Sequence, residues 1–480
     1  MKTGFANRLF LAVLSFAMAA TIRADVSATV TSVRQNWPWD TRVKVEYEVS
    51  GGVCDVTPLL VFGGEDSAIR IPQSKTLSYS TGAEYSLRGD LCAVGPGTHV
   101  LEFDAAAIAF PTNVSRPVAM KGLSVSLEVK ETSLRKYLVI DLSSMPYAIS
   151  WLDAVPDGGW TDEYKTSKMV LARIPVYGET TFEVGAPTNE FGFVEKYEKP
   201  GRFASLTNDY YMCIFEVTQK QWQNVMGTVP SGITANNVAD TKPVTKVSWR
   251  DFMGDPLDSG GCHWPVTSAV SSDCFVGRLR ANTTLPPSFT AGYKFNLPTQ
   301  VQWEFACRGG VMSTWYDGSD ISVSIDETRN GNARPYDTNL ERLAWYAHNS
   351  SGRLHPVGGK LPNAYGLYDM LGNATEWNAD YALADNLPVG TEPVGERSWS
   401  ASTAPNRALR GGNYSSYAFA VLTTYKEYGQ INASQGDQDY GILTQRPAFH
   451  VRMSWGDKHD FISARIALAY TRVAEIVAGQ

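Results

Sequence analysis

Apolar and polar residues alternate along several segments in the first part of the chain. In segment 43–49, valine and tyrosine side chains alternate with lysine and glutamate, and segments 99–104 and 123–129 repeat this pattern. A period of two is typical of a strand with one buried face. Gly-Gly and Pro-Gly pairs separate these segments and indicate turns. Several short strands joined by such turns predict a small all-β, sandwich-like domain over residues 25–130.

Sequence signals for the starts of helices appear later in the chain, and three of these starts share the same type of capping residues. A hydroxyl residue stands three positions before Gln or Asp, so that each side chain can bond the other residue's backbone amide in a capping box. The three pairs are Thr218 with Gln221, Ser248 with Asp251, and Thr299 with Gln302. Gly227 and Gly309 then provide helix ends. Short helices between long loops predict an α+β domain with much irregular structure.

The length of the chain, 480 residues, indicates more than one domain. Residues 131–168 are less regular, and the turn-rich sequence DAVPDGGW at 153–160 predicts a connector there. We expect the second domain over residues 169–472, followed by a tail at 473–480.

The N-terminus has the composition of an export signal. Residues 1–8 are basic, and residues 9–20 form an apolar and small-residue run. That run is too short to cross a bilayer, which needs about 20 residues. The pattern predicts a secretory signal peptide over residues 1–24, with cleavage after either Ala19 or Ala24. We therefore expect a secreted or periplasmic protein without a transmembrane segment in the mature chain.

Charge and histidine content exclude two classes of function. The formal net charge is −7, whereas binding to nucleic acid requires clustered Lys and Arg. The six histidines are scattered, and no cysteine spacing resembles a zinc site. We expect neither a nucleic-acid partner nor a histidine-based metal centre.

Six cysteines in an exported protein predict disulfides, because pairing is the default in an oxidising compartment. We expect Cys54 to pair with Cys92, and Cys262 with Cys274. Cys213 and Cys307 remain, and the sequence leaves open whether they form a bridge or stay buried as thiols.

Five motifs of the second domain resemble, in this order, the formylglycine-generating enzyme family, also called the sulfatase-modifying-factor domain. They are EVTQKQW, PVTKVSW, LPTQVQWEFACRGG, HPVGGKLPNAYGLYDMLGNATEW and RALRGGNYSS. The resemblance covers about residues 169–472, and ISARIAL at 462–468 is similar to the family's GFRLA ending. It implies a loop-rich variant of the C-type lectin-like fold, which agrees with the α+β pattern.

The resemblance also implies that the catalytic cysteines are missing. The family's oxidases convert a sulfatase cysteine to formylglycine with two cysteines that bind Cu(I), in a pattern close to RGGSWxCxxxxC. Here Ser416 and Val421 stand at the two cysteine positions, Asn413 replaces a serine and Thr375 a tryptophan. Hydroxyl and alkyl groups do not replace the soft thiolates that hold Cu(I). No cysteine follows Cys307, so we do not expect copper.

A structural calcium site of the family is expected to be retained. Calcium binds several oxygens from carboxylates and from carbonyls of a bent backbone. The resemblance places these donors on the side chains of Asp369 and Glu376 and on the carbonyls of Gly372 and Ala374.

The first functional hypothesis is a non-catalytic module that binds a partner or the cell envelope, with a protein, peptide or glycan as ligand. The candidate groove residues follow or belong to the RGG motif and are Arg410, Asn413, Tyr414, Ser416 and Tyr417. The alternative is that the tyrosines only pack the loop. The second hypothesis is a formylglycine-generating oxidase that acts on sulfatase cysteines through an atypical site.

Overall fold

The structure is a computed structural model, and it describes most but not all of the chain. The described residues are 25–35, 39–61, 68–71, 76–77, 87–108, 124–177, 179–185, 202–255, 264, 268–289, 292–320, 336–381, 389–394, 407–416, 418, 426–427, 429–430, 451–452 and 458–470. The expected signal peptide and the C-terminal tail lie outside these ranges. Within them, no helix combines the length and the apolar character that a membrane crossing requires.

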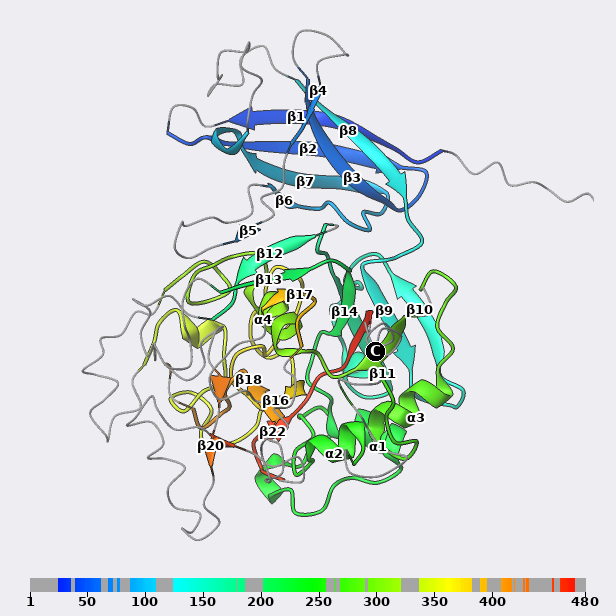
Figure 1. Cartoon of the computed structure of the whole chain (residues 1–480), viewed down its shortest axis with the longest axis vertical. Coiled ribbons are helices and arrows are strands. Elements are labelled where there is room, and N and C mark those ends of the chain that lie inside the picture. Colours follow the sequence, from blue (N-terminus) through cyan, green and yellow to red (C-terminus); the bar gives the residue numbers. More distant parts are fainter. Residues whose placement is uncertain are drawn as a thin grey trace, which may run out of the picture.

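The N-terminal part contains two antiparallel sheets. The first has the spatial order β1 (Ser27–Gln35), β2 (Arg42–Ser50), β7 (Gly97–Asp104) and β6 (Leu87–Gly89). The second has the order β4 (Ala68–Arg70), β3 (Cys54–Val61) and β8 (Ser124–Glu131). Every second residue of β2 from Val43 to Val49 is buried, as the alternation predicts. One apolar cluster includes side chains of both sheets, such as Leu101 and Leu60. Figure 1 shows these strands, blue to cyan, above the rest of the molecule.

A six-stranded sheet forms the centre of the C-terminal part. Its order is β10 (Ala148–Leu152), β9 (Tyr137–Asp141), β11 (Lys168–Ile174), β14 (Tyr210–Cys213), β23 (Ala467–Tyr470) and β15 (Tyr293–Asn296). Leu138 and Ile140 pack into one apolar cluster, and Tyr137 and Val139 pack into another. The sheet therefore has a core on each face, and the inner strand β9 is apolar without alternation.

Strands β9 and β10 correct the expected connector, because they lie within residues 131–168. Both belong to the central sheet, and β9 pairs with β11 from Tyr137 to Asp141. The prediction missed β9 because YLVI is apolar on both faces and has no period of two. The second domain therefore includes residues that the sequence assigned to a linker.

The remaining strands form small sheets at the edge of the central one. They are β17 (Gly390–Thr391), β13 (Phe203–Leu206), β12 (Thr180–Glu183) and β5 (Thr76–Leu77); β19 (Lys426–Glu427), β18 (Arg407–Arg410), β16 (Thr375–Tyr381) and β22 (Ile462–Ser463); and β20 (Gly429–Gln430) with β21 (Val451–Arg452). Strand β5 comes from the N-terminal part and pairs in parallel with β12. The two parts of the chain are thus joined by a shared sheet.

Four α-helices are described, and the three expected capping boxes are confirmed. The helices are α1 (Gln219–Met226), α2 (Trp249–Met253), α3 (Phe275–Asn282) and α4 (Gln300–Arg308). Reciprocal caps begin α1, α2 and α4, and Gly227 and Gly309 end α1 and α4 in the left-handed conformation. Helix α3 was not predicted, because its cap is the Cys274 thiol, which accepts a hydrogen bond from the Gly277 amide.

Candidate functional site

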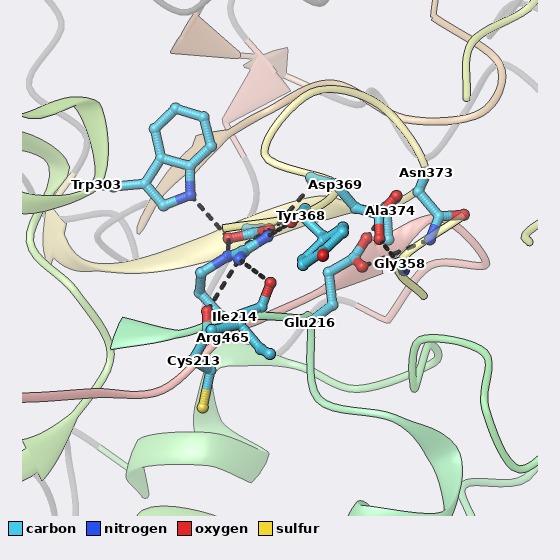
Figure 2. A network of polar contacts seen from close by, with 11 residues as sticks. Cys213, Ile214, Glu216, Trp303, Gly358, Tyr368, Asp369, Asn373, Ala374 and Arg465 are labelled. Carbon is cyan, nitrogen blue, oxygen red and sulfur yellow. Dashed lines mark hydrogen bonds and ion pairs between the residues drawn. The ribbon is translucent and has the colours of Figure 1, made fainter. Parts of the chain in front are cut away.

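Arg465, which follows β22, is the centre of a buried polar network (Figure 2). Its guanidinium donates to both carboxylate oxygens of Glu376 on β16 at 2.6, 2.8 and 2.9 Å. It also donates to the carbonyls of Cys213 and Tyr368, each at 3.0 Å. The Trp303 indole of α4 donates to Glu376 at 2.7 Å. Because these charged groups are buried and hydrogen-bonded, the network fixes the strands and loops that meet there.

Two further carboxyl groups, Glu216 and Asp369, lie beside this ion pair. Glu216 accepts from the Ala374 amide at 3.2 Å, and Asp369 accepts from the Gly358 amide at 2.6 Å. Burial raises the pKa of Asp369 to about 6. Burial, together with the charge of Asp369, raises the pKa of Glu216 well above its usual value. The carboxyl groups outnumber the single guanidinium, so the cluster favours a bound proton or cation.

The structure changes the expected calcium donors. Arg465 and Trp303 engage both oxygens of Glu376, so this side chain does not fit a calcium ligand. Asp369 fits better, because its second carboxylate oxygen is buried without a hydrogen-bond partner. Among the described residues no group of three or more His, Cys, Asp or Glu side chains is arranged around a metal position. Calcium binding stays a prediction, with Asp369 as its side-chain donor.

The loop that carries the RGG motif rests on this network. The Gly372 amide donates to the Gly411 carbonyl at 2.9 Å, and the Tyr414 amide donates to the Asn373 carbonyl at 3.0 Å. The Asn373 side chain also accepts from the backbone of His355 at 3.0 Å. Three segments that are distant in sequence therefore meet around Asn373.

Two of the residues that were predicted to depart from the family pattern contact each other. The Asn413 side-chain amide donates to the Thr375 hydroxyl at 3.1 Å, and both residues are buried. The Asn413 backbone amide donates to the Ser416 hydroxyl at 3.0 Å, and the Ser416 amide returns a bond to the Asn413 carbonyl at 2.9 Å. These bonds close a turn in which the Ser416 hydroxyl serves as a structural acceptor.

The candidate groove residues divide between core and surface. Arg410 is fully buried and pairs with Glu304 of α4 at 3.2 Å, so it is not exposed to a ligand. Asn413 is 5% exposed, whereas Tyr414 and Ser416 are partly exposed. Two expected site residues, Tyr417 and Val421, lie outside the described residues.

The cysteines correct the disulfide prediction for the N-terminal part. Cys54 and Cys92 are free thiols. The physical reason is register, since the residue opposite Cys54 is Val94. Cys213 and Cys307 are also thiols, and they are buried in different apolar clusters. For the Cys262–Cys274 pair, Cys262 lies outside the described residues, so that pairing stays a prediction.

The buried thiols do not have the chemistry of a reactive site. Burial raises the pKa of Cys213 to about 12 and raises that of Cys307 well above its ordinary value of 9.0. Thiolates are the nucleophiles and metal ligands of cysteine, and a neutral buried thiol is inert.

Sequence reasoning did not single out Glu216 and Arg465. Glu216 is the first residue of the EVTQKQW motif, and Arg465 lies in ISARIAL. For Arg465 the available signal was a charged residue inside a mostly apolar motif, because such a residue is rarely buried without a partner.

Comparisons with known proteins identify the family to which the C-terminal part of the chain belongs. A family sequence model described as "Sulfatase-modifying factor enzyme 1-like domain" (FGE-sulfatase) matches residues 166–445. The chain is 27% identical over 251 residues to "Chaperone protein LppX" of Paenibacillus barcinonensis, covering 50% of this chain and 80% of that protein. It is 29% identical over 177 residues to the formylglycine-generating enzyme of Bos taurus, covering 36% of this chain and 41% of that enzyme. The match therefore spans less than half of the bovine enzyme.

Among solved structures, the chain is similar to "Treponema denticola variable protein 1". The two share 22% sequence identity with a TM-score of 0.40, and the match covers 63% of this chain and 95% of that one.

Proposed function

Because the chain belongs to the sulfatase-modifying factor enzyme 1-like domain family, we propose that its C-terminal domain is a non-catalytic binding module. In this proposal the family scaffold is kept, while the copper chemistry of the oxidases is lost. The scaffold is a variant of the C-type lectin-like fold, and the N-terminal sheets form a β-sandwich beside it.

The observation that carries the proposal is that no cysteine follows Cys307 in the sequence. In this proposal, as the resemblance implies, Ser416 and Val421 stand at the positions of the catalytic cysteines. Cu(I) requires soft thiolate ligands, which a hydroxyl and an alkyl group do not replace. Of the four cysteines of the domain, Cys213 and Cys307 are buried thiols with raised pKa values, so they are poor substitutes.

The contact between Asn413 and Thr375 supports the same interpretation. An oxidase needs open space for the substrate thiol and for oxygen beside its copper. Here these two side chains are buried and bond each other, and the Ser416 hydroxyl accepts a bond from the same turn. These contacts support the proposal that packed polar side chains occupy the former reaction position.

A protein ligand outside the cytoplasm suits this module best. The relative from Paenibacillus barcinonensis, of which this chain covers 80%, is named a chaperone protein, and a chaperone acts by binding polypeptides. The apolar run at residues 9–20 supports export, to the periplasm or the exterior. We place the binding surface at the partly exposed Tyr414 and Ser416.

We also propose a structural calcium ion at Asp369, with the carbonyls of Gly372 and Ala374 as further donors. The unpartnered buried oxygen of Asp369 supports it. Calcium should raise the melting temperature of EDTA-treated protein, and Asp369→Ala should remove this response. An equal response in the Asp369→Ala protein would contradict the assignment.

The proposed loss of catalysis is tested with a Cys-x-Pro-x-Arg peptide, the sulfatase-type substrate. The full chain is incubated with the peptide, Cu(I) and oxygen, and mass spectrometry follows the cysteine. We expect the thiol to remain unchanged while an active formylglycine-generating enzyme converts it in parallel. Formation of the aldehyde by this protein would show that it is an oxidase with an atypical site.

A further inference from the structure

The segment that joins β6 to β7, residues 90–96, lies at the junction of the two parts of the chain. Cys54 on β3 exchanges two backbone hydrogen bonds with Val94, at 3.0 and 2.8 Å. Gly95 packs against Asp153, which follows β10, because a Cβ atom at Gly95 would lie only 3.3 Å from the Asp153 Cβ. Figure 1 shows β6 and β7 on the side of the N-terminal sheets that faces the C-terminal part.

An ion pair across the junction also contacts this segment. The Ala93 amide donates to Asp55 Oδ1 at 2.9 Å, and the same oxygen accepts from Arg173 on β11 at 3.0 Å. The Asp55 carboxylate therefore bonds residues 90–96 on one side and the C-terminal part on the other. The position of the segment bears directly on how the two parts are held together.

The ring of His99 on β7 contacts this segment at two places. Its Nδ1 lies 3.3 Å from Asp90 Oδ2, and its Nε2 lies 2.8 Å from the Gly95 carbonyl oxygen. The His99 side chain is 20% exposed, and that of Asp90 is 44% exposed. One ring thus links the first residue of the segment to the residue that packs against the C-terminal part.

Both atoms that face the ring are acceptors, which makes its protonation state important. A neutral imidazole carries one N–H, so it donates to one of the two oxygens and turns a lone pair toward the other. The charged imidazolium has two N–H groups and can donate to both, and the bond to a carboxylate is then charge-assisted. The geometry of His99 therefore favours the protonated ring.

Four further titratable groups belong to the segment or to elements around it: Tyr47 on β2, Cys54 on β3, Cys92 in the segment, and Tyr137 on β9. Burial raises the pKa of each, so all four stay neutral between pH 5 and pH 8. The ion pairs that face the segment from other elements join Asp55 and Asp209 to Arg173, and Asp153 to Arg135. Histidine is the residue type that ordinarily changes its charge in this range.

We propose that protonation of His99 closes a clasp on residues 90–96 and thereby tightens the junction between the two parts of the chain. In the folded protein each nitrogen of the charged ring has an acceptor, whereas in the unfolded chain water solvates either form. Folding therefore favours the protonated ring. The clasp adds stability at acid pH, and this added stability is lost as the pH rises past the range in which histidine titrates.

Chemical denaturation of the full chain at pH 5.5 and pH 8.0 tests the clasp. His99→Gln keeps a polar side chain at this position but removes the titrating group. From pH 8.0 to pH 5.5, we expect the ratio of folded to unfolded protein to rise about threefold more for the wild type than for His99→Gln. His348→Gln removes an exposed histidine of the C-terminal part and is the matched control, which should follow the wild type.

Asp90→Asn keeps the test possible if His99→Gln fails to fold. The Asp90 side chain is partly exposed, and this change removes only the carboxylate that faces the ring. We expect Asp90→Asn to lose the same pH-dependent part of the stability. Hydrogen exchange with mass spectrometry then locates the effect. At pH 5.5 the amides of residues 91–95 should exchange about threefold faster in either variant than in the wild type, and the difference should shrink at pH 8.0.

Parallel stability profiles of the wild type, His99→Gln and Asp90→Asn would overturn the clasp. So would an equal loss of stability at both pH values, since that is the result of a contact that does not depend on the proton. Exchange in residues 91–95 that is the same in all three proteins would also overturn it. None of these results bears on the absence of catalysis, which the peptide assay measures separately.

Discussion

At the scale of single residues, the hydrogen bond between Asn413 and Thr375 links the two proposed replacements in the former reaction centre. Asn413→Ala should lower the free energy of unfolding by about 1 to 2 kcal/mol, because it leaves the buried Thr375 hydroxyl without its partner. Thr375→Ala should have a similar effect. Chemical denaturation measures both, with Ser126→Ala on the exposed face of β8 as a control.

The double variant decides whether the two residues act as a pair. If they do, its loss should fall short of the sum of the single losses by about 1 kcal/mol. Strict additivity of the two changes would show that the contact contributes nothing.

Cys307 provides a prediction for pH dependence. Its ordinary thiol pKa is 9.0, and burial raises the pKa far above that value in the folded protein. Above pH 9 the unfolded chain therefore loses a proton that the folded chain keeps, so stability falls as the pH rises. Between pH 8 and pH 10 the loss should be about 1.4 kcal/mol greater for the wild type than for Cys307→Ala.

Denaturation curves of both proteins at the two pH values measure this difference. Tyrosines and lysines titrate in both proteins, so the comparison isolates the thiol. Parallel pH profiles of the two proteins would contradict a buried, neutral Cys307.

The resemblance pointed to the RGG loop, to Ser416 and to Glu376 from the sequence alone. It could not reveal that Glu376 pairs with Arg465, because the two residues are 89 positions apart and no local pattern links their motifs. Glu216 was missed for a similar reason, since its contact with Ala374 spans 158 positions. Which charged residues pair across such distances in the sequence depends on how the folded chain packs.

At the scale of secondary-structure elements, helix α4 connects the sequence pattern with the site. Its capping box at Thr299 sets the start of the helix, and Trp303 and Glu304 then reach Glu376 and Arg410. The three capping boxes were readable because the signal lies within four residues. Strand β9 was not readable, because its apolar residues face two cores.

Thr299→Ala should therefore lower the free energy of unfolding by about 1 kcal/mol, the usual cost of a lost cap. Thr234→Ala is the matched control, because Thr234 precedes a short helical turn and makes no side-chain cap bond. Thermal or chemical unfolding compares the two. Equal effects would mean that the α4 cap has no specific role.

At the scale of the whole molecule, the two parts of the chain are joined by an ion pair as well as by β5. Arg173 on β11 donates to Asp55 on β3 at 3.0 Å and to Asp209 at 2.9 Å. The Arg173 side chain is 7% exposed, so these two carboxylates, rather than water, stabilise its positive charge. The sequence predicted two domains but could not predict that they share a buried cation.

Arg173→Ala should lower the free energy of unfolding by about 2 to 3 kcal/mol, because two carboxylates lose their partner. Arg135→Ala removes a more exposed ion pair with Asp153 and should change the free energy of unfolding by less than about 1 kcal/mol. Calorimetry of the full chain compares the variants. A loss for Arg173→Ala no larger than for Arg135→Ala would contradict a coupled interface.

Competition for Cu(I) against a chromophoric chelator tests whether the domain keeps the family scaffold without the copper site. We expect that the full chain does not withdraw Cu(I) from the chelator, and that Ser416→Ala behaves like the wild type. An active formylglycine-generating enzyme should withdraw the ion under the same conditions. Retention of one Cu(I) ion by the chain, and its loss on the Ser416→Ala change, would show that the domain has a copper site after all.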